Sequence, residues 1–291
     1  MKRIVRYVFL LSLLLFLIGA SGLAYLYARH PEIVFHQVNQ TPIQEEKRFD
    51  ASKVKGLAIS TDTTDISVVS GEGKEVIVRL TGQISGSRKN GLRFETGLTP
   101  EQQVTVDLEH QVQFGFNMGM SSSLDLQIVV PPKLYEELKI TTSTGDIELK
   151  NVQANTMHVE TSTGTVNVFA SKGKEMEITT STGDVEVTDS QAAYNIQSDT
   201  GDITLKQKLE QNVTINTSTG DVVCKLTRVP EAFRVDAESS TGDVDTEMVV
   251  QLEEKRTENS YFGTKGSNGP VVDIRSTTGS IRIVEGNEQG L

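Results

Sequence analysis

The chain has 291 residues, of which 36% are hydrophobic and only 5% aromatic, and its 28 basic residues against 39 acidic ones give a net charge of −11. This acidic balance argues against a nucleic-acid partner, because such a partner requires a basic stripe to neutralise its phosphates. The single cysteine, Cys224, excludes a disulfide framework and a cysteine-based zinc site.

An uncharged run of 21 residues extends from Tyr7 to Tyr27. As a helix it would rise about 31 Å, which is enough to cross a hydrocarbon core of roughly 30 Å. A cleaved signal peptide would have a shorter apolar core followed by a small-residue cleavage site, and no such site is present. We therefore predict one transmembrane anchor at 7–28.

Three basic residues precede this run: Lys2, Arg3 and Arg6. The positive-inside rule then predicts a cytoplasmic tail at 1–6 and an extracytoplasmic location for everything after the anchor. Without those three, 25 basic residues remain against 39 acidic ones, so the exterior part carries a net charge of −14. We expect a single-pass protein of the cell membrane, with a juxtamembrane stalk at 29–46.

Residues 47–132 contain alternating apolar positions, as in Leu124–Val130, and end abruptly at Pro131 and Pro132. Proline cannot donate a hydrogen bond to a β-ladder, so the pair ends this section. We predict a β-rich cap here that covers the open edge of the region that follows.

A Thr-Gly motif, followed by Asp, Thr or Ser and then by Ile or Val, recurs along the rest of the chain at the glycines Gly145, Gly164, Gly183, Gly201, Gly220, Gly242 and Gly279. The spacings are 19, 19, 18, 19, 22 and 37 residues. Because the last is close to two periods, one turn near Tyr261–Gly269 is expected to have lost the motif. A weaker copy, Thr64-Asp65-Ile66, lies far upstream.

Apolar and polar residues alternate on both sides of each glycine, which predicts two short strands per repeat and leaves no room for a helix. One such unit cannot bury its own apolar face, whereas stacked copies share a continuous core. The predicted fold is all-β, a single-handed β-solenoid (β-helix) at 133–285 with coils of about 18–19 residues. It is followed by a tail at 286–291. Antiparallel hairpins in a sandwich are the alternative architecture.

Glycine is expected at the corners because stacked corners leave no room for a Cβ atom and require an unusual backbone conformation. The recurrent aspartates would form a ladder beside these corners: Asp146, Asp184, Asp202, Asp221 and Asp243. Either each carboxylate accepts bonds from turn amides, which we favour, or the ladder attracts a cation such as Ca²⁺. Thr165 and Ser280 interrupt the ladder, and no other metal site and no cofactor is expected.

Catalytic signatures are not found in the sequence: the four histidines occur in none of the spacings typical of zinc proteases or hydrolases. Cys224 matches an inward repeat position, where a thiol is an inert core group. Thr142, Thr161 and Thr180 share parity with apolar inward residues, which disfavours an outward ice-binding array. We therefore expect no enzyme.

The basic N-terminus, the single span, the strand-rich section ending in Pro131-Pro132 and the repeated Thr-Ser-Thr-Gly-Asp motif resemble the provisionally named adhesin β-strand-repeat family of Gram-positive bacteria, including LiaG-like proteins. This resemblance implies a membrane-anchored protein linked to cell-envelope stress, with no catalytic residues to transfer. The expected function is a non-enzymatic binding or scaffold module in envelope stress response or adhesion, with a protein partner in the envelope or membrane. An envelope-polysaccharide hydrolase or lyase, or an accessory to a membrane sensor kinase, are the alternatives. The sequence sets no oligomeric state.

Overall fold

The computed structural model describes residues 12, 15–22, 25, 40–85, 91–110, 123–248 and 253–286. Residues 15–22 are helical and belong to the predicted anchor, whose remaining residues lie mostly outside the described part. Among the described residues, no helix is long and apolar enough to cross a membrane. The predicted tail at 1–6 lies outside the described residues, whereas residues 40–46, predicted in the stalk, are part of the first strand.

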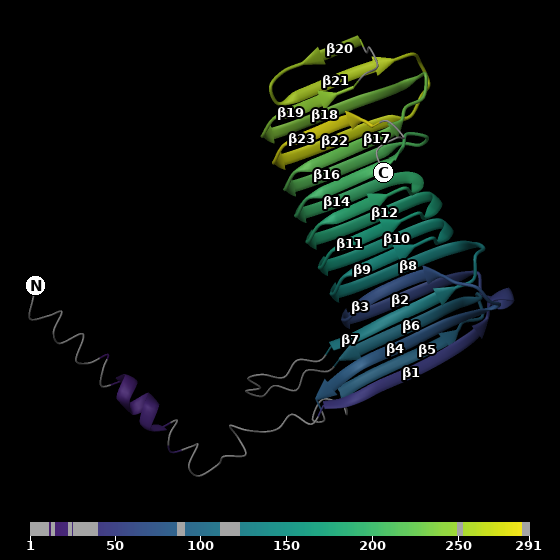
Figure 1. Ribbon diagram of the computed structural model, residues 1–291, viewed down its shortest axis with the longest axis vertical. Helices are drawn as coiled ribbons and strands as arrows, with labels where there is room; N and C mark the ends of the chain where they lie inside the picture. The colour runs from purple at the N-terminus through teal and green to yellow at the C-terminus, as the bar shows by residue number, and fades with distance from the viewer. Residues whose placement is uncertain are drawn as a thin grey trace, which may run out of the picture.

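The β region consists of two long sheets that face each other along the molecule (Figure 1). Sheet 1 has eleven strands in the order β1 (Gln40–Asp50), β4 (Glu75–Ser85), β7 (Ser123–Val130), β3 (Asp65–Ser70), β9 (Ile147–Lys150), β11 (Val166–Phe169), β13 (Val185–Thr188), β15 (Ile203–Lys208), β17 (Val222–Arg228), β23 (Ile281–Glu285) and β19 (Val244–Glu247). Sheet 2 has twelve strands in the order β20 (Glu253–Arg256), β21 (Ser260–Lys265), β18 (Phe233–Thr241), β22 (Val271–Thr278), β16 (Val213–Thr219), β14 (Gln191–Thr200), β12 (Lys172–Thr182), β10 (Gln153–Thr163), β8 (Leu134–Thr144), β2 (Gly56–Thr63), β6 (Gln103–His110) and β5 (Leu92–Leu98). A short 3₁₀ helix at Ala51–Lys53 joins β1 to β2.

Each repeat forms one coil, with one strand in each sheet and the Thr-Gly corner between them. The strands of successive coils pair in parallel and in register, so that Val159 lies beside Ile140 on one side and Ile178 on the other. This pairing excludes the antiparallel sandwich, in which neighbouring repeats would alternate in direction. The all-β class predicted from the repeat is confirmed, and the parallel stacking of successive coils agrees with the predicted solenoid.

The core follows from the alternation of side chains along each strand. In β9, Ile147 and Leu149 are fully buried, whereas Glu148 and Lys150 are exposed. Equivalent residues of the coils form one continuous apolar cluster from Ala51 to Ile283. Because burying such a side chain contributes about 1.5–3 kcal/mol, each coil depends on its neighbours to cover it.

The corner glycines have a backbone conformation and a spacing that only glycine fits. Their φ angles lie between +135° and +149°, a region that side-chain-bearing residues rarely adopt. A Cβ atom on Gly164 would lie 2.0 Å from the carbonyl oxygen of Gly145, and one on Gly183 would lie 2.0 Å from that of Gly164. The corners therefore stack directly on one another.

At the C-terminal end, the coils do not stack in sequence order. The coil formed by β22 and β23 is inserted between the coil of β16 and β17 and that of β18 and β19. Accordingly, Gly279 packs on the carbonyl of Gly220, and Gly242 packs on that of Gly279. The expected turn without a motif near Tyr261–Gly269 is wrong, because β20 and β21 pair antiparallel at the edge of sheet 2 instead. The spacing of 37 residues between Gly242 and Gly279 is long because β20 and β21 lie between these two corners in the sequence.

At the N-terminal end, residues 47–132 do more than cap the stack. Strands β2 and β3 form a full coil that pairs in parallel with β8 and β9, and the corner at Thr64 packs against Gly145. Strands β6 and β7 pair in parallel with the opposite side of that coil. Strands β1, β4 and β5 are joined to this end by antiparallel pairing, β4 with β7 and β1, and β5 with β6, and they cover it. Pro42 and the charged stretch 45–48 on β1 discourage further pairing at this edge.

Alanine substitutions at two glycines separate the energetic cost of an unfavourable φ angle from the cost of a steric clash at the added Cβ atom. We predict that Gly183→Ala lowers the free energy of unfolding by more than about 4 kcal/mol, because the new Cβ meets backbone as well as an unfavourable φ. Gly73→Ala is the matched control, since Gly73 has a φ of +133° but nothing within 4 Å of the added Cβ.

We predict a cost of roughly 1–2 kcal/mol for this control. Guanidinium unfolding of the full chain in detergent measures both values. Equal losses in the two variants would contradict the close stacking of corners.

Candidate functional site

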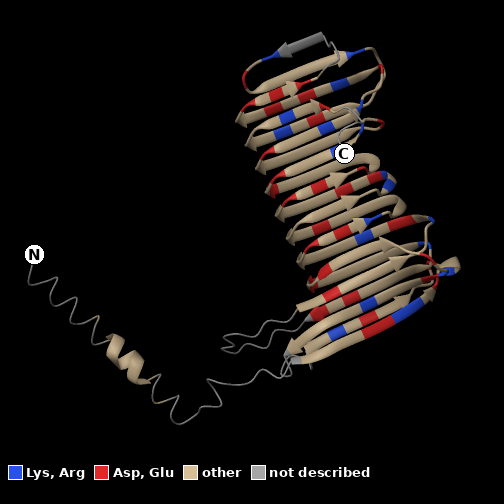
Figure 2. Cartoon of the chain, viewed as in Figure 1, with Lys and Arg blue, Asp and Glu red and all other residues tan. Residues whose placement is uncertain are grey.

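The aspartates of the repeat form a row along one edge of the stack, where acidic residues recur at the ends of the strands (Figure 2). The carboxylate of Asp184 accepts a hydrogen bond of 2.9 Å from the backbone N–H of Asp202, and that of Asp202 accepts one of 2.8 Å from Asp221. Asp146 and Asp221 likewise accept from the N–H groups of Thr165 and Ser280, at 2.7 and 2.8 Å. The carboxylates thus bond to turn amides of the next coil.

Through these hydrogen bonds the aspartate row has a structural role, because it joins neighbouring coils. Asp65 of the weak upstream copy takes part as well, because its carboxylate accepts from the N–H of Asp146 at 2.9 Å. Asp243 precedes β19, which belongs to the last coil of the stack. Binding of calcium by this row of aspartates stays a prediction. Within the described part of the chain, no group of three or more His, Cys, Asp or Glu residues has the geometry of a metal site.

The other residues considered for chemistry are engaged or buried. The His158 ring nitrogen Nδ1 lies 3.0 Å from a carboxylate oxygen of Glu177, and Nε2 lies 3.6 Å from Glu160. Cys224 is fully buried, and burial raises the pKa of its thiol to about 12. His30 and His36 lie outside the described residues.

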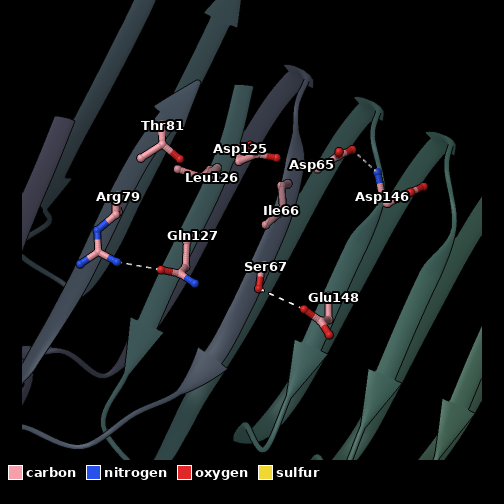
Figure 3. A pocket seen from close by; sticks show the side chains of 10 residues that line it. All are labelled: Asp65, Ile66, Ser67, Arg79, Thr81, Asp125, Leu126, Gln127, Asp146 and Glu148. Atoms are coloured by element: carbon pink, nitrogen blue, oxygen red, sulfur yellow. Dashed lines mark hydrogen bonds between the residues drawn. The ribbon is translucent and has the colours of Figure 1, made fainter. Parts of the chain in front are cut away.

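The outer face of sheet 1 carries a hollow of about 320 Å³, the sheet 1 trough, which spans β4, β7, β3 and β9 (Figure 3). Its polar groups are largely paired with one another. Arg79 donates to Gln127 at 2.9 Å and forms an ion pair with Glu46 at 2.9 Å. Ser67 donates to Glu148 at 3.3 Å. The side chains of Thr81 and Asp125, which also line this trough, make no hydrogen bond within the described part of the chain.

A larger hollow of about 530 Å³, the sheet 2 trough, lies on the outer face of sheet 2 beside the corners. It extends over five adjacent strands, β12, β14, β16, β22 and β18. Its lining is entirely polar: Thr179, Thr180, Ser181, Gln197, Ser198, Asp199, Asn216, Thr217, Ser218, Glu238, Ser240, Arg275, Ser276 and Thr277.

The sheet 2 trough lies between two rows of outward side chains. Gln197 and Asn216 are neighbours in register within one row, and Ser218 belongs to the other row. The sequence reasoning concentrated on the residues common to all repeats and so missed these positions, which change from coil to coil. Comparing the outward residues of successive repeats would have shown the run of amides and hydroxyls.

Removing one aspartate of the row tests its structural role. We predict that Asp202→Ala lowers the free energy of unfolding by about 1.5–3 kcal/mol, because the N–H of Asp221 loses a charged acceptor. Asp202→Asn is the matched control, since its side-chain oxygen still accepts that bond while the repulsion between neighbouring carboxylates is reduced. Thermal and urea unfolding measure the difference. A loss in Asp202→Asn as large as that in Asp202→Ala would contradict this role.

Comparison with known proteins gives a family but no activity. No curated protein matches the chain. A solved structure from Clostridium sporogenes, provisionally named a cell adhesion protein, is 14% identical with a TM-score of 0.39, covering 84% of this chain and 100% of its own. Provisionally named adhesins from Bacteroides fragilis and Parabacteroides distasonis are each 10% identical, with TM-scores of 0.39 and 0.43. The two matches cover 83% and 84% of this chain, and each covers 97% of the other protein's chain.

The model of one family, described as Toastrack DUF4097, matches residues 131–284. The match begins at the proline pair before β8 and ends in β23, so it contains all seven Thr-Gly corners. The chain belongs to the Toastrack DUF4097 family.

Proposed function

We propose that this protein is a membrane-anchored, extracytoplasmic binding and scaffold module of the cell envelope, similar to LiaG-like proteins, acting in stress response or adhesion without catalysing a reaction. The observation that carries this proposal is the polar trough on the outer face of sheet 2, held by a continuously packed stack. A surface of this kind is suited to bind an extended partner, because its shape repeats from coil to coil.

The chemistry of the described residues favours binding over catalysis. Covalent or acid–base catalysis requires a nucleophile or base with a positioned partner beside a site for the reacting atoms. The only cysteine is buried inside the stack. Two of the carboxylates beside the sheet 1 trough accept hydrogen bonds from other protein groups, Asp65 from the N–H of Asp146 and Glu148 from the hydroxyl of Ser67.

The uncharged run at Tyr7–Tyr27 and the three basic residues before it support an anchor with the N-terminus inside. In this arrangement the β stack lies in the envelope space and carries most of the acidic excess. Long-range repulsion then disfavours anionic polymers as partners, so the proposed partners are proteins or uncharged polymers.

The location is tested with the full chain produced in a Gram-positive host. We expect the protein in the membrane pellet, and we expect protease added to intact protoplasts to digest the β stack. Recovery in the soluble cytoplasmic fraction, or protection of the stack until the protoplasts are lysed, would contradict the proposal.

The role of the anchor is tested by replacing residues 7–27 with an unrelated membrane span. A scaffold that acts through its β stack keeps its crosslinked envelope partners after this replacement. Loss of those partners with the β stack still exported and folded would favour contact through the helix, as expected for an accessory to a sensor kinase.

A further inference from the structure

We propose that the sheet 2 trough binds an uncharged glycan chain lying along the axis of the stack. This inference rests on the binding role proposed above and names the ligand class of that surface. It follows from the shape of the trough, the hydrogen-bonding groups that line it, and its charge.

The trough has the form required by a linear chain. Its five strands are consecutive in sheet 2, and neighbouring strands lie about 4.8 Å apart, so the trough is roughly 20 Å long. The spacing between neighbouring strands is comparable to the length of one sugar residue. Each sugar of a chain along the axis would therefore lie over one strand and meet a similar set of side chains. A tetrasaccharide therefore matches its length.

The walls of the trough offer hydrogen-bonding groups that the protein does not use. The side chains of Gln197 and Asn216 make no hydrogen bond within the described part of the chain, although they lie beside each other. Each amide supplies two N–H donors and one carbonyl acceptor. By contrast, Gln127 in the sheet 1 trough accepts a bond from Arg79. The free amides distinguish the sheet 2 trough from the other hollow.

The floor of the trough adds no free hydroxyl to this set. Thr180, Ser198, Thr217 and Ser276 line it, but each shares parity with the buried apolar residues of its strand and is only 2–6% exposed, so its side chain faces the interior of the stack. A ligand on the outer face therefore meets the outward side chains beside these positions, such as Thr179 and Ser181 on β12.

The charges of the trough disfavour an anionic ligand. The one basic residue, Arg275, is held by three carboxylates, with contacts of 2.9 Å to Asp236, 3.1 Å to Asp273 and 3.5 Å to Glu238. Its positive charge is therefore neutralised. The carboxylates of Asp199 and Glu238 at the rim repel phosphate- or carboxylate-bearing polymers.

A peptide or lipid is also a poor fit. No apolar or aromatic side chain lines the trough, so it offers no pocket for such groups. The central floor strands β14, β16 and β22 pair in parallel on both sides, which leaves no backbone edge to accept an added strand. An uncharged, hydroxyl-rich chain is the ligand whose chemistry remains.

The test is titration calorimetry of the full chain in detergent with chitotetraose, an uncharged tetramer of N-acetylglucosamine, and with maltotetraose. We expect one of them to bind with a Kd of about 1 mM, because the contacts are hydrogen bonds without aromatic stacking. The double variant Gln197→Ala, Asn216→Ala is expected to weaken binding by roughly tenfold or more. Asn167→Ala, which removes an outward amide from β11 in sheet 1, is the matched control and leaves binding unchanged.

A second variant, Ser218→Tyr, fills the trough from its other wall and should also abolish binding while the melting temperature stays near that of the parent. Binding of neither tetramer, or equal binding by the double variant, would overturn the inference. Displacement of the sugar by an extended peptide at equal concentration would overturn the choice of ligand class. If glycan binding fails while envelope partners are still crosslinked, only this inference falls; if the chain is not in the envelope, the proposed function falls.

Discussion

The close approach of one corner to the next is the constraint on which the rest of the structure depends. A Cβ atom on Gly164 would lie 2.0 Å from the carbonyl oxygen of Gly145, so the coils with a Thr-Gly corner must pass that corner without a side chain. That approach fixes the register of the strands on both sides. Fixed register in turn aligns the aspartates, the inward hydroxyls and the outward amides into rows. The trough on sheet 2 is a consequence of these rows, because it lies between two of them.

The ends of the stack are held by segments that return from elsewhere in the chain. At one end, β6 and β7 pair with β2 and β3 on the side opposite β8 and β9. At the other, the coil of β22 and β23 separates two coils that are consecutive in sequence. Antiparallel strands then form the outer edges of both sheets at the N-terminal end and of sheet 2 at the C-terminal end, which limits pairing with other chains there. The terminal coils are thus coupled to the middle of the stack by contacts distant in sequence.

Much of the repeat could be predicted from the sequence, because glycine spacing and alternation depend on local geometry. The inward position of Thr142, Thr161 and Thr180 follows from parity and agrees with their burial. The order of the last coils could not be predicted, since Thr241-Gly242 and Thr278-Gly279 fit equally well on the corner at Gly220. Identical corners specify which positions stack, but not which coil is the neighbour. The trough was missed for a related reason, as its amides occupy positions that vary between repeats.

Disulfide trapping of the exposed threonine row tests the stacking most directly. Thr219 and Thr278 are neighbours in register, whereas Thr219 and Thr241 are separated by the strand between them. Paired strands lie about 4.8 Å apart, and a disulfide requires Cα atoms within roughly 7 Å. Cys224 is fully buried, so it does not compete. We predict that Thr219→Cys with Thr278→Cys crosslinks under mild oxidation and that Thr219→Cys with Thr241→Cys does not. Efficient crosslinking of only the second pair would show that the coils follow sequence order and would contradict this account.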